Sequence, residues 1–130
     1  MPDYTLPRAE RLRSLTAIRR LFSDGQGGFV YPFRYTYIVE RGVEGDEAGH
    51  GVEVMFSVPK KFHKRANRRN LLKRRSREAY RLSREVLTPR LHEQKSHVQL
   101  ALVYSTKECH TYKTISHAIQ RILQQIAQNV

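Results

Sequence analysis

The chain has 130 residues, and its 24 Lys and Arg outnumber its 12 Asp and Glu, which leaves a formal charge of +12 with histidine neutral. This length suits one domain with its own core, and a positive field of this size attracts polyanions such as nucleic acid, so the composition argues against a small-molecule enzyme with a neutral surface. No apolar run approaches the roughly 18 residues of a membrane span, and a single cysteine excludes an intrachain disulfide and a zinc site of the CxxC type.

The first predicted element is a short amphipathic helix over residues 14–23, with Ser14 or Thr16 as its N-terminal cap. The glycine-rich stretch 24–28 is typical of a chain reversal and would end this helix. The apolar side chains expected to share one helical face are Leu15, Ile18, Leu21 and Phe22.

Two extended segments are predicted next. Aromatic side chains alternate with other types from Phe33 onward, as on a strand whose two faces differ. A second alternating segment begins at Val52 and stops at Pro59. The acidic, glycine-rich stretch 40–51 between them predicts a solvent loop, and a hairpin of the two strands is the simplest pairing.

The remaining elements are a long basic helix over 66–87, an apolar strand over 97–104 and a final amphipathic helix capped by Thr111 or Thr114. No internal repeat is visible. The order α, β-hairpin, α, β, α predicts a single α+β domain over residues 1–130. Its helices would pack on a central sheet, with a β-α-β crossover through the basic helix.

Half of the chain's cations, twelve Lys or Arg, lie in the segment 60–84, where Glu78 is the only acidic residue. Like charges at i,i+4 spacing cost an isolated helix a few tenths of a kcal/mol per pair, whereas a passive solvated face mixes signs. We infer that phosphate groups meet this face, where Arg supplies a bidentate fork. The expected phosphate-binding residues are Lys60, Lys61, Arg65, Arg68, Arg69, Asn70, Lys73, Arg74, Arg77 and Arg81.

On a helical wheel the opposite face of this helix is apolar and would pack on the sheet. Tyr80 falls on the basic edge instead, and Arg75 interrupts the apolar face. The residues expected to form the packing face are Leu71, Leu72, Ala79, Leu82 and Val86.

The run 57–82 resembles the signature region of the bacterial ribonuclease P protein family, the small basic partners of a catalytic RNA. The matching pairs are Lys60-Lys61, Arg69-Asn70, Lys73-Arg74 and Arg77-Glu78. Leu71 stands where the family usually has a second Arg, so the patch should be thinner there, with Arg68 or Arg75 as the compensating neighbour. The basic segment and first helix at 6–22, the aromatic strand and the final helix also follow the family's order.

The resemblance implies a ribosomal protein S5 domain 2-like fold with a left-handed crossover, an exception to the usual right-handed rule. It also implies a cleft between the first helix and the sheet for the single-stranded 5′ leader of precursor tRNA, where aromatic rings stack on unpaired bases. Alternating aromatics on a strand are more often plain core. The candidate cleft residues are Ile18, Phe22, Phe33, Tyr35 and Tyr37.

We expect no catalytic side chain and no metal site in the chain, because the carboxylates are scattered. His63 lies beside the basic patch and fits a loop donor to phosphate better than a general base. The resemblance implies that the RNA subunit performs Mg²⁺-dependent hydrolysis, which leaves the mature 5′ end of tRNA. Mg²⁺ would be held mainly by that RNA, and no organic cofactor is expected.

The expected partners are ribonuclease P RNA and precursor tRNA, with no membrane and no obligate protein partner. The first residues have neither the basic start nor the apolar stretch of a secretory signal, so a cytoplasmic location is expected. A structural RNA-binding protein of the ribosomal type remains the main alternative. A DNA-binding helix fits less well, because no second helix or dimerisation heptad accompanies the basic one. Cys109 is expected to be a buried structural thiol.

Overall fold

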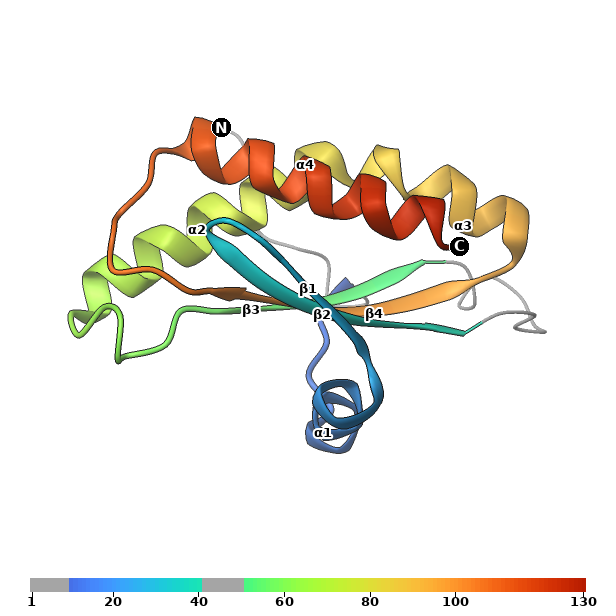
Figure 1. The fold of residues 1–130 in the computed structure, drawn as a ribbon, viewed down its shortest axis with the longest axis horizontal. Coiled ribbons are helices and arrows are strands. Elements are labelled where there is room, and N and C mark those ends of the chain that lie inside the picture. Colours follow the sequence, from blue (N-terminus) through green and yellow to red (C-terminus); the bar gives the residue numbers. More distant parts are fainter. Residues whose placement is uncertain (1–9, 41–50) are drawn as a thin grey trace.

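The computed structural model describes residues 10–40 and 51–130. A twisted sheet separates α1, on one face, from α2, α3 and α4, which cover the other face (Figure 1). Residues 41–50 of the loop expected over 40–51, and the first residues of the expected N-terminal basic segment, lie outside the described residues. The elements are α1 (Leu15–Asp24), β1 (Gln26–Val30), β2 (Phe33–Glu40), β3 (Val52–Ser57), α2 (Ala66–Ser83), the 3₁₀ turn η3 (Arg84–Val86), α3 (Thr88–Gln94), β4 (His97–Tyr104) and α4 (Tyr112–Gln128).

The described strands form one four-stranded sheet in the order β1-β2-β4-β3. β2 pairs antiparallel with β1 and with β4, while β3 pairs parallel with β4. The parallel pair confirms a β-α-β crossover through α2, and its left-handed sense stays a prediction. The expected hairpin of β2 with β3 is wrong, because β4 lies between them. Val98, Leu100 and Leu102 of β4 are fully buried, and a strand of this kind is most stable at the centre of a sheet.

β1 is an element that the sequence analysis missed, since the glycines at its start predict a chain reversal. The strand is possible there because glycine leaves room for its neighbours. A Cβ on Gly28 would lie 2.5 Å from the Tyr35 hydroxyl oxygen, so the ring of Tyr35 packs directly against the β1 backbone.

α1 begins as predicted, with the Ser14 hydroxyl accepting a hydrogen bond from the amide of Ala17 at 3.3 Å. Leu21 is fully buried against the sheet together with Leu12 and Ala101. The expected apolar face is only partly covered, however, because Leu15 and Phe22 remain exposed. Leu21 already attaches α1 to the sheet, so packing does not explain why the neighbouring aromatic residue Phe22 is exposed.

The larger core lies on the other face of the sheet, under α2 and α4. α4 begins at its Thr111 cap and buries the face that its spacing predicts. Across from it, β2 turns its aromatic side chains inward, and the Tyr35 hydroxyl donates to Gln125 Oε1 at 2.6 Å. The predicted and buried residues of α4 are Ile115, Ile119, Ile122, Leu123 and Ile126.

α2 ends at Ser83, earlier than the expected end at residue 87, and a 3₁₀ turn leads into α3, which the sequence analysis missed. Its packing face is also rotated from the expected one. Tyr80, expected on the basic edge, is buried and packs edge-on against Phe56, with the ring centroids 6.0 Å apart. Ser76 can lie on this buried face because its hydroxyl is satisfied within the helix, where Oγ donates to Leu72 O at 2.8 Å. The buried residues are Leu72, Ser76, Ala79, Tyr80 and Ser83, while Leu82 and Val86 are exposed.

The turn from α1 into β1 is predicted to tolerate no side chain at Gly25. A Cβ there would lie 2.4 Å from Leu21 O and 2.6 Å from Thr36 Oγ1. We expect Gly25→Ala to destabilise the protein by about 1–3 kcal/mol in denaturant unfolding. Gly27→Ala is the matched control, since its nearest neighbour is Tyr35 O at 3.5 Å. Equal stability of the two variants would contradict the packing at this turn.

Candidate nucleic-acid interface

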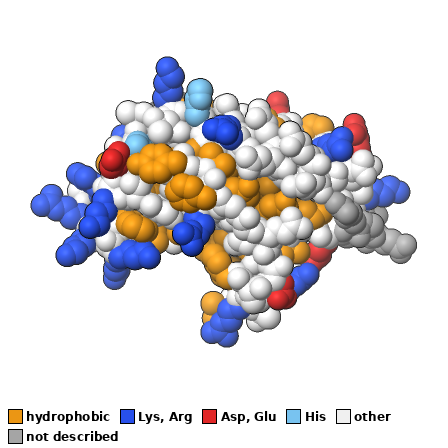
Figure 2. Space-filling view, viewed as in Figure 1, with side chains coloured by type: hydrophobic (Ala, Val, Ile, Leu, Met, Phe, Trp, Pro, Cys, Tyr) orange, Lys and Arg blue, Asp and Glu red, His pale blue; other side chains and the backbone are white. Residues whose placement is uncertain are grey.

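A group of exposed cations surrounds the loop that connects β3 to α2. Lys64, Arg65 and Arg68 line a hollow in the surface, and Phe62 is also part of its lining. Lys107 joins them from the loop between β4 and α4, which sequence reasoning could not foresee because it is far away in the chain. Figure 2 shows Lys and Arg side chains gathered at this end of the molecule. We call this group the basic surface: Lys60, Lys61, Lys64, Arg65, Arg68 and Lys107.

Hydrogen bonds hold the loop of the basic surface in place. The amides of Phe62 and His63 both donate to Pro59 O, which closes a tight turn. His63 is 4% exposed, and its Nε2 lies 2.9 Å from Thr106 O. The expectation that His63 donates to phosphate is therefore wrong. Its ring ties the two loops together and so brings Lys107 beside the other cations.

Arg69, the first residue of the Arg-Asn pair, also acts on this loop. Its Nη1 donates to His63 O at 3.0 Å and to Lys64 O at 2.8 Å. The guanidinium is half-buried against the loop instead of facing solvent along the helix. We therefore assign Arg69 a positioning role for the basic surface, whereas the sequence analysis treats it as a direct phosphate ligand.

Further cations of α2 follow the basic surface along the helix. Asn70 and Arg74 are exposed, while Lys73, Arg77 and Arg81 are half-buried. Burial lowers the pKa of the Arg77 guanidinium, and the nearby charges of Arg11 and Arg74 lower it further. Like charges are thus held close together here, and an anion such as a phosphate group would relieve the repulsion.

Arg75, which interrupts the expected apolar face of α2, binds the loop between β4 and α4. Its Nη1 donates to His110 O at 2.7 Å and lies 3.8 Å from Cys109 Sγ. Arg68 is exposed on the basic surface, so it is the better candidate to compensate for Leu71. Cys109 is exposed, and the expectation of a buried thiol is wrong.

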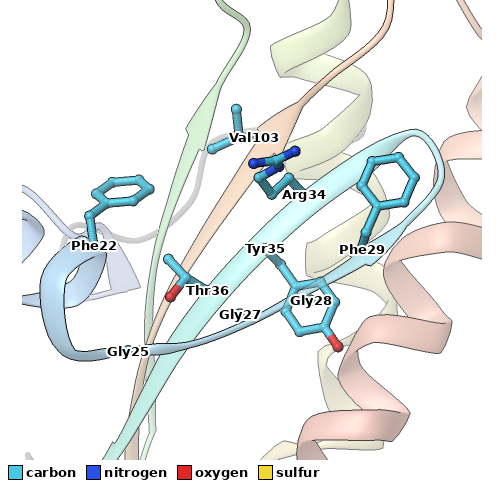
Figure 3. Close-up of a pocket in the computed structure, with 9 residues that line it drawn as sticks. All are labelled: Phe22, Gly25, Gly27, Gly28, Phe29, Arg34, Tyr35, Thr36 and Val103. Atoms are coloured by element: carbon cyan, nitrogen blue, oxygen red, sulfur yellow. The ribbon is translucent and has the colours of Figure 1, made fainter.

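A cleft of about 480 Å³ opens between α1 and the sheet (Figure 3). Phe22 of α1 forms one side and Phe29 of β1 the other, and each is a little more than half exposed. Arg34 of β2 is paired with Phe29 on one neighbouring strand and with Val103 on the other. Thr36 lies further along the floor. The cleft therefore presents two aromatic rings with a cation between them.

The expected aromatic lining of this cleft is largely wrong. Phe33 and Tyr37 lie in the core beneath α4, and Tyr35, although it borders the cleft, directs its hydroxyl to α4. Burial, followed by the neighbouring Tyr37, raises the pKa of Tyr35. Ile18 packs on the small core under α1. Of the five expected residues, Phe22 is the one whose ring is largely exposed in the cleft.

The pleat of β2 explains why the predicted aromatic lining of the cleft is wrong, because alternate residues of a strand face opposite sides of a sheet. If the aromatics at 33, 35 and 37 face the core, Arg34 and Thr36 must face α1. The alternation was visible in the sequence, but the helix that covers each face was not. Phe29 was missed because β1 was missed.

The carboxylates are dispersed over the described part of the chain. Glu10 pairs with Arg84, Glu40 with Arg20 at 2.9 Å, and Glu53 with His97 at 2.8 Å. Within residues 10–40 and 51–130, no three His, Cys, Asp or Glu gather where they could hold a metal ion. In the same ranges no helix is long and apolar enough to cross a membrane.

Comparisons with known proteins point to one family. The Ribonuclease P family model matches residues 6–127. The ribonuclease P protein component of Porphyromonas gingivalis strain W83 is 35% identical over 132 residues, which cover 99% of this chain and 91% of the relative. The structure of the RNase P protein from Thermotoga maritima matches with a TM-score of 0.69 at 21% identity, covering 89% of this chain and 96% of that one. A Staphylococcus aureus RNase P protein mutant with defective mRNA degradation activity matches with a TM-score of 0.70 at 17% identity, covering 93% and 90%.

Proposed function

Since the chain belongs to the ribonuclease P protein family, we propose that it binds the catalytic RNA of that endoribonuclease through the basic surface and the 5′ leader of precursor tRNA in the cleft. The supporting observation is the cleft itself, an open groove with exposed rings at both sides and Arg34 between them. Such a groove can bind unpaired nucleotides, because their bases stack on aromatic rings and their phosphates pair with guanidinium groups.

The basic surface suits a folded RNA partner. Its cations are exposed on loops and at a helix start, which suits contact with phosphates and recognition of shape. Positive charge between two RNAs offsets their mutual repulsion and lowers the concentration of Mg²⁺ that their association needs. The cleft would add selectivity, because a precursor has a leader to bind and a mature tRNA does not.

We assign the hydrolysis to the RNA subunit. In the described part of this chain Glu10 is paired with Arg84, Glu40 with Arg20 and Glu53 with His97, and no three potential metal ligands gather, so these residues do not fit a shared Mg²⁺ site. The chain's own residues bind and orient two RNAs in the cytoplasm.

Cleavage of 5′-labelled precursor tRNA at low Mg²⁺ tests this proposal. The reaction is run with bacterial ribonuclease P RNA alone, with the protein alone, and with both. We expect cleavage at the mature 5′ end only when both are present. Cleavage by the protein alone would contradict the assignment of the chemistry, and tight RNA binding without stimulation would indicate a structural RNA-binding protein instead.

A substitution at Arg69 tests how the basic surface is held. Arg69→Lys keeps the charge but cannot donate to both His63 O and Lys64 O through one planar group. We expect about threefold to tenfold weaker binding of ribonuclease P RNA. A hydrogen bond from a charged group contributes about 1.5–3 kcal/mol, and because Arg69 acts on the loop and not on RNA, only part of this loss reaches the phosphate contacts. The amides of the loop should also exchange faster with solvent.

The matched control for Arg69→Lys is Arg19→Lys, a change at an exposed position on α1 outside both surfaces. It should alter neither RNA affinity nor exchange in the loop. Weaker RNA binding by Arg69→Lys with unchanged exchange would show that the side chain contacts RNA directly, which would contradict a positioning role.

A further inference from the structure

The tip of the β1–β2 hairpin carries aromatic rings that no core covers. Phe29 is 54% exposed and Tyr31 is 48% exposed. Their ring centroids are 6.4 Å apart, and the ring of His110 follows 5.1 Å from that of Tyr31, both pairs edge-on. We call these three residues the aromatic ladder.

The aromatic ladder continues the cleft. Phe29 belongs to both, since it lines the cleft on the side opposite Phe22 (Figure 3). From Phe29 the rings lead over the hairpin tip to the loop between β4 and α4. Anything that leaves the cleft on the hairpin side therefore meets Tyr31 next.

Hydrogen bonds hold the middle of the aromatic ladder in a set orientation. The Tyr31 hydroxyl lies 3.3 Å from Thr106 Oγ1 and 2.9 Å from His110 Nε2. Arg75 in turn donates to His110 O from α2. A ring that is positioned in advance loses little conformational freedom when a ligand stacks on it, which favours binding.

The charges around the aromatic ladder fit single-stranded RNA. Arg34 is exposed and is paired directly with Phe29 across the hairpin. Lys107 is also exposed, and it follows Thr106, whose hydroxyl contacts that of Tyr31. Exposed rings beside cations are the usual elements of a groove for single strands. At the His110 end of the aromatic ladder, Glu108 Oε2 lies 3.5 Å from His110 Nε2. Because a carboxylate repels phosphate, RNA would contact this end through its bases.

We propose that the aromatic ladder is a second base-stacking site, which binds unpaired nucleotides of the leader after they leave the cleft on the hairpin side. This inference rests on the proposed function, because it takes the cleft as a leader site. The consequence is a dependence on leader length: affinity should rise again once the leader is long enough to reach Tyr31.

The test measures the affinity of the assembled holoenzyme for precursor tRNAs whose leaders are lengthened one nucleotide at a time. For leaders that end inside the cleft, Tyr31→Ala should bind as the unmodified protein does. For leaders that pass the hairpin tip it should bind about fivefold to tenfold more weakly, as the loss of one stacked base predicts. Leu82→Ala removes an exposed apolar side chain from α2 and should have no effect at any length.

A parallel series with Phe22→Ala separates this inference from the proposed function. Loss of affinity in Phe22→Ala at every leader length, with no length-dependent loss in Tyr31→Ala, would overturn the aromatic ladder and leave the cleft intact. No loss in either variant would overturn both. A change in holoenzyme self-association in Tyr31→Ala, without any change in leader affinity, would assign the rings to a protein contact and also overturn the inference.

Discussion

Replacing Arg65 and Arg68 together with alanine is expected to lower the affinity for ribonuclease P RNA by about a hundredfold. Both side chains are exposed and line the same hollow of the basic surface. A hydrogen bond to a charged group contributes about 1.5–3 kcal/mol, so the loss of two phosphate contacts at the lower end of this range, as expected for exposed side chains, accounts for an effect of this size.

The salt dependence of binding gives the double variant a second readout. Each lost phosphate contact should reduce the slope of log affinity against log salt by about 0.7–0.9. The matched control is Arg90→Ala with Arg121→Ala, which removes the same charge from exposed positions on α3 and α4. An equal loss in both double variants would mean that net charge, and not the basic surface, determines RNA binding.

The second large effect is expected from Phe22→Ala. The variant removes one of the two exposed rings of the cleft and should weaken the binding of precursor tRNA to the holoenzyme by fivefold to a hundredfold, since stacking of one base contributes about 1–3 kcal/mol. Mature tRNA, which has no leader, should bind unchanged.

Leu15→Ala is the control for Phe22→Ala, because Leu15 lies on the same helix and is similarly exposed but is outside the cleft. It should leave the affinity for both tRNAs unaltered. If Phe22→Ala weakened precursor and mature tRNA equally, the ring would contact the tRNA body or stabilise the fold, and the leader assignment would be wrong.

Local patterns in the sequence were sufficient for several elements. The spacing of Ile115, Ile119 and Ile126 predicts α4 and its buried face correctly, and Ser14 and Thr111 cap the helices as expected. These features depend on residues within a few positions of one another. The apolar run at 97–104 also predicts the buried strand, although its place between β2 and β3 depends on contacts distant in the chain.

The predictions of the cleft lining and of the RNA-binding cations were wrong where one local sequence pattern is compatible with two tertiary arrangements. Alternation on β2 indicates two faces but not which of them meets α1, so the resemblance, which implies an aromatic cleft, predicts Phe33, Tyr35 and Tyr37 where the structure has Arg34 and Thr36. The spacing of the cations on α2 likewise does not distinguish basic residues that bind the protein's own loops from those that remain free to bind phosphate. In the structure Arg69 and Arg75 bind loop carbonyls, whereas Arg65 and Arg68 remain at the surface.

In the proposed complex the leader of precursor tRNA lies between α1 and the sheet. Photo-crosslinking from single leader nucleotides in the assembled holoenzyme, with the crosslinked peptides identified by mass spectrometry, measures this position. The structure predicts crosslinks to the peptides that contain Phe22 and Arg34, which face the cleft. Crosslinks confined to α4, on the opposite face of the sheet, would contradict the claim.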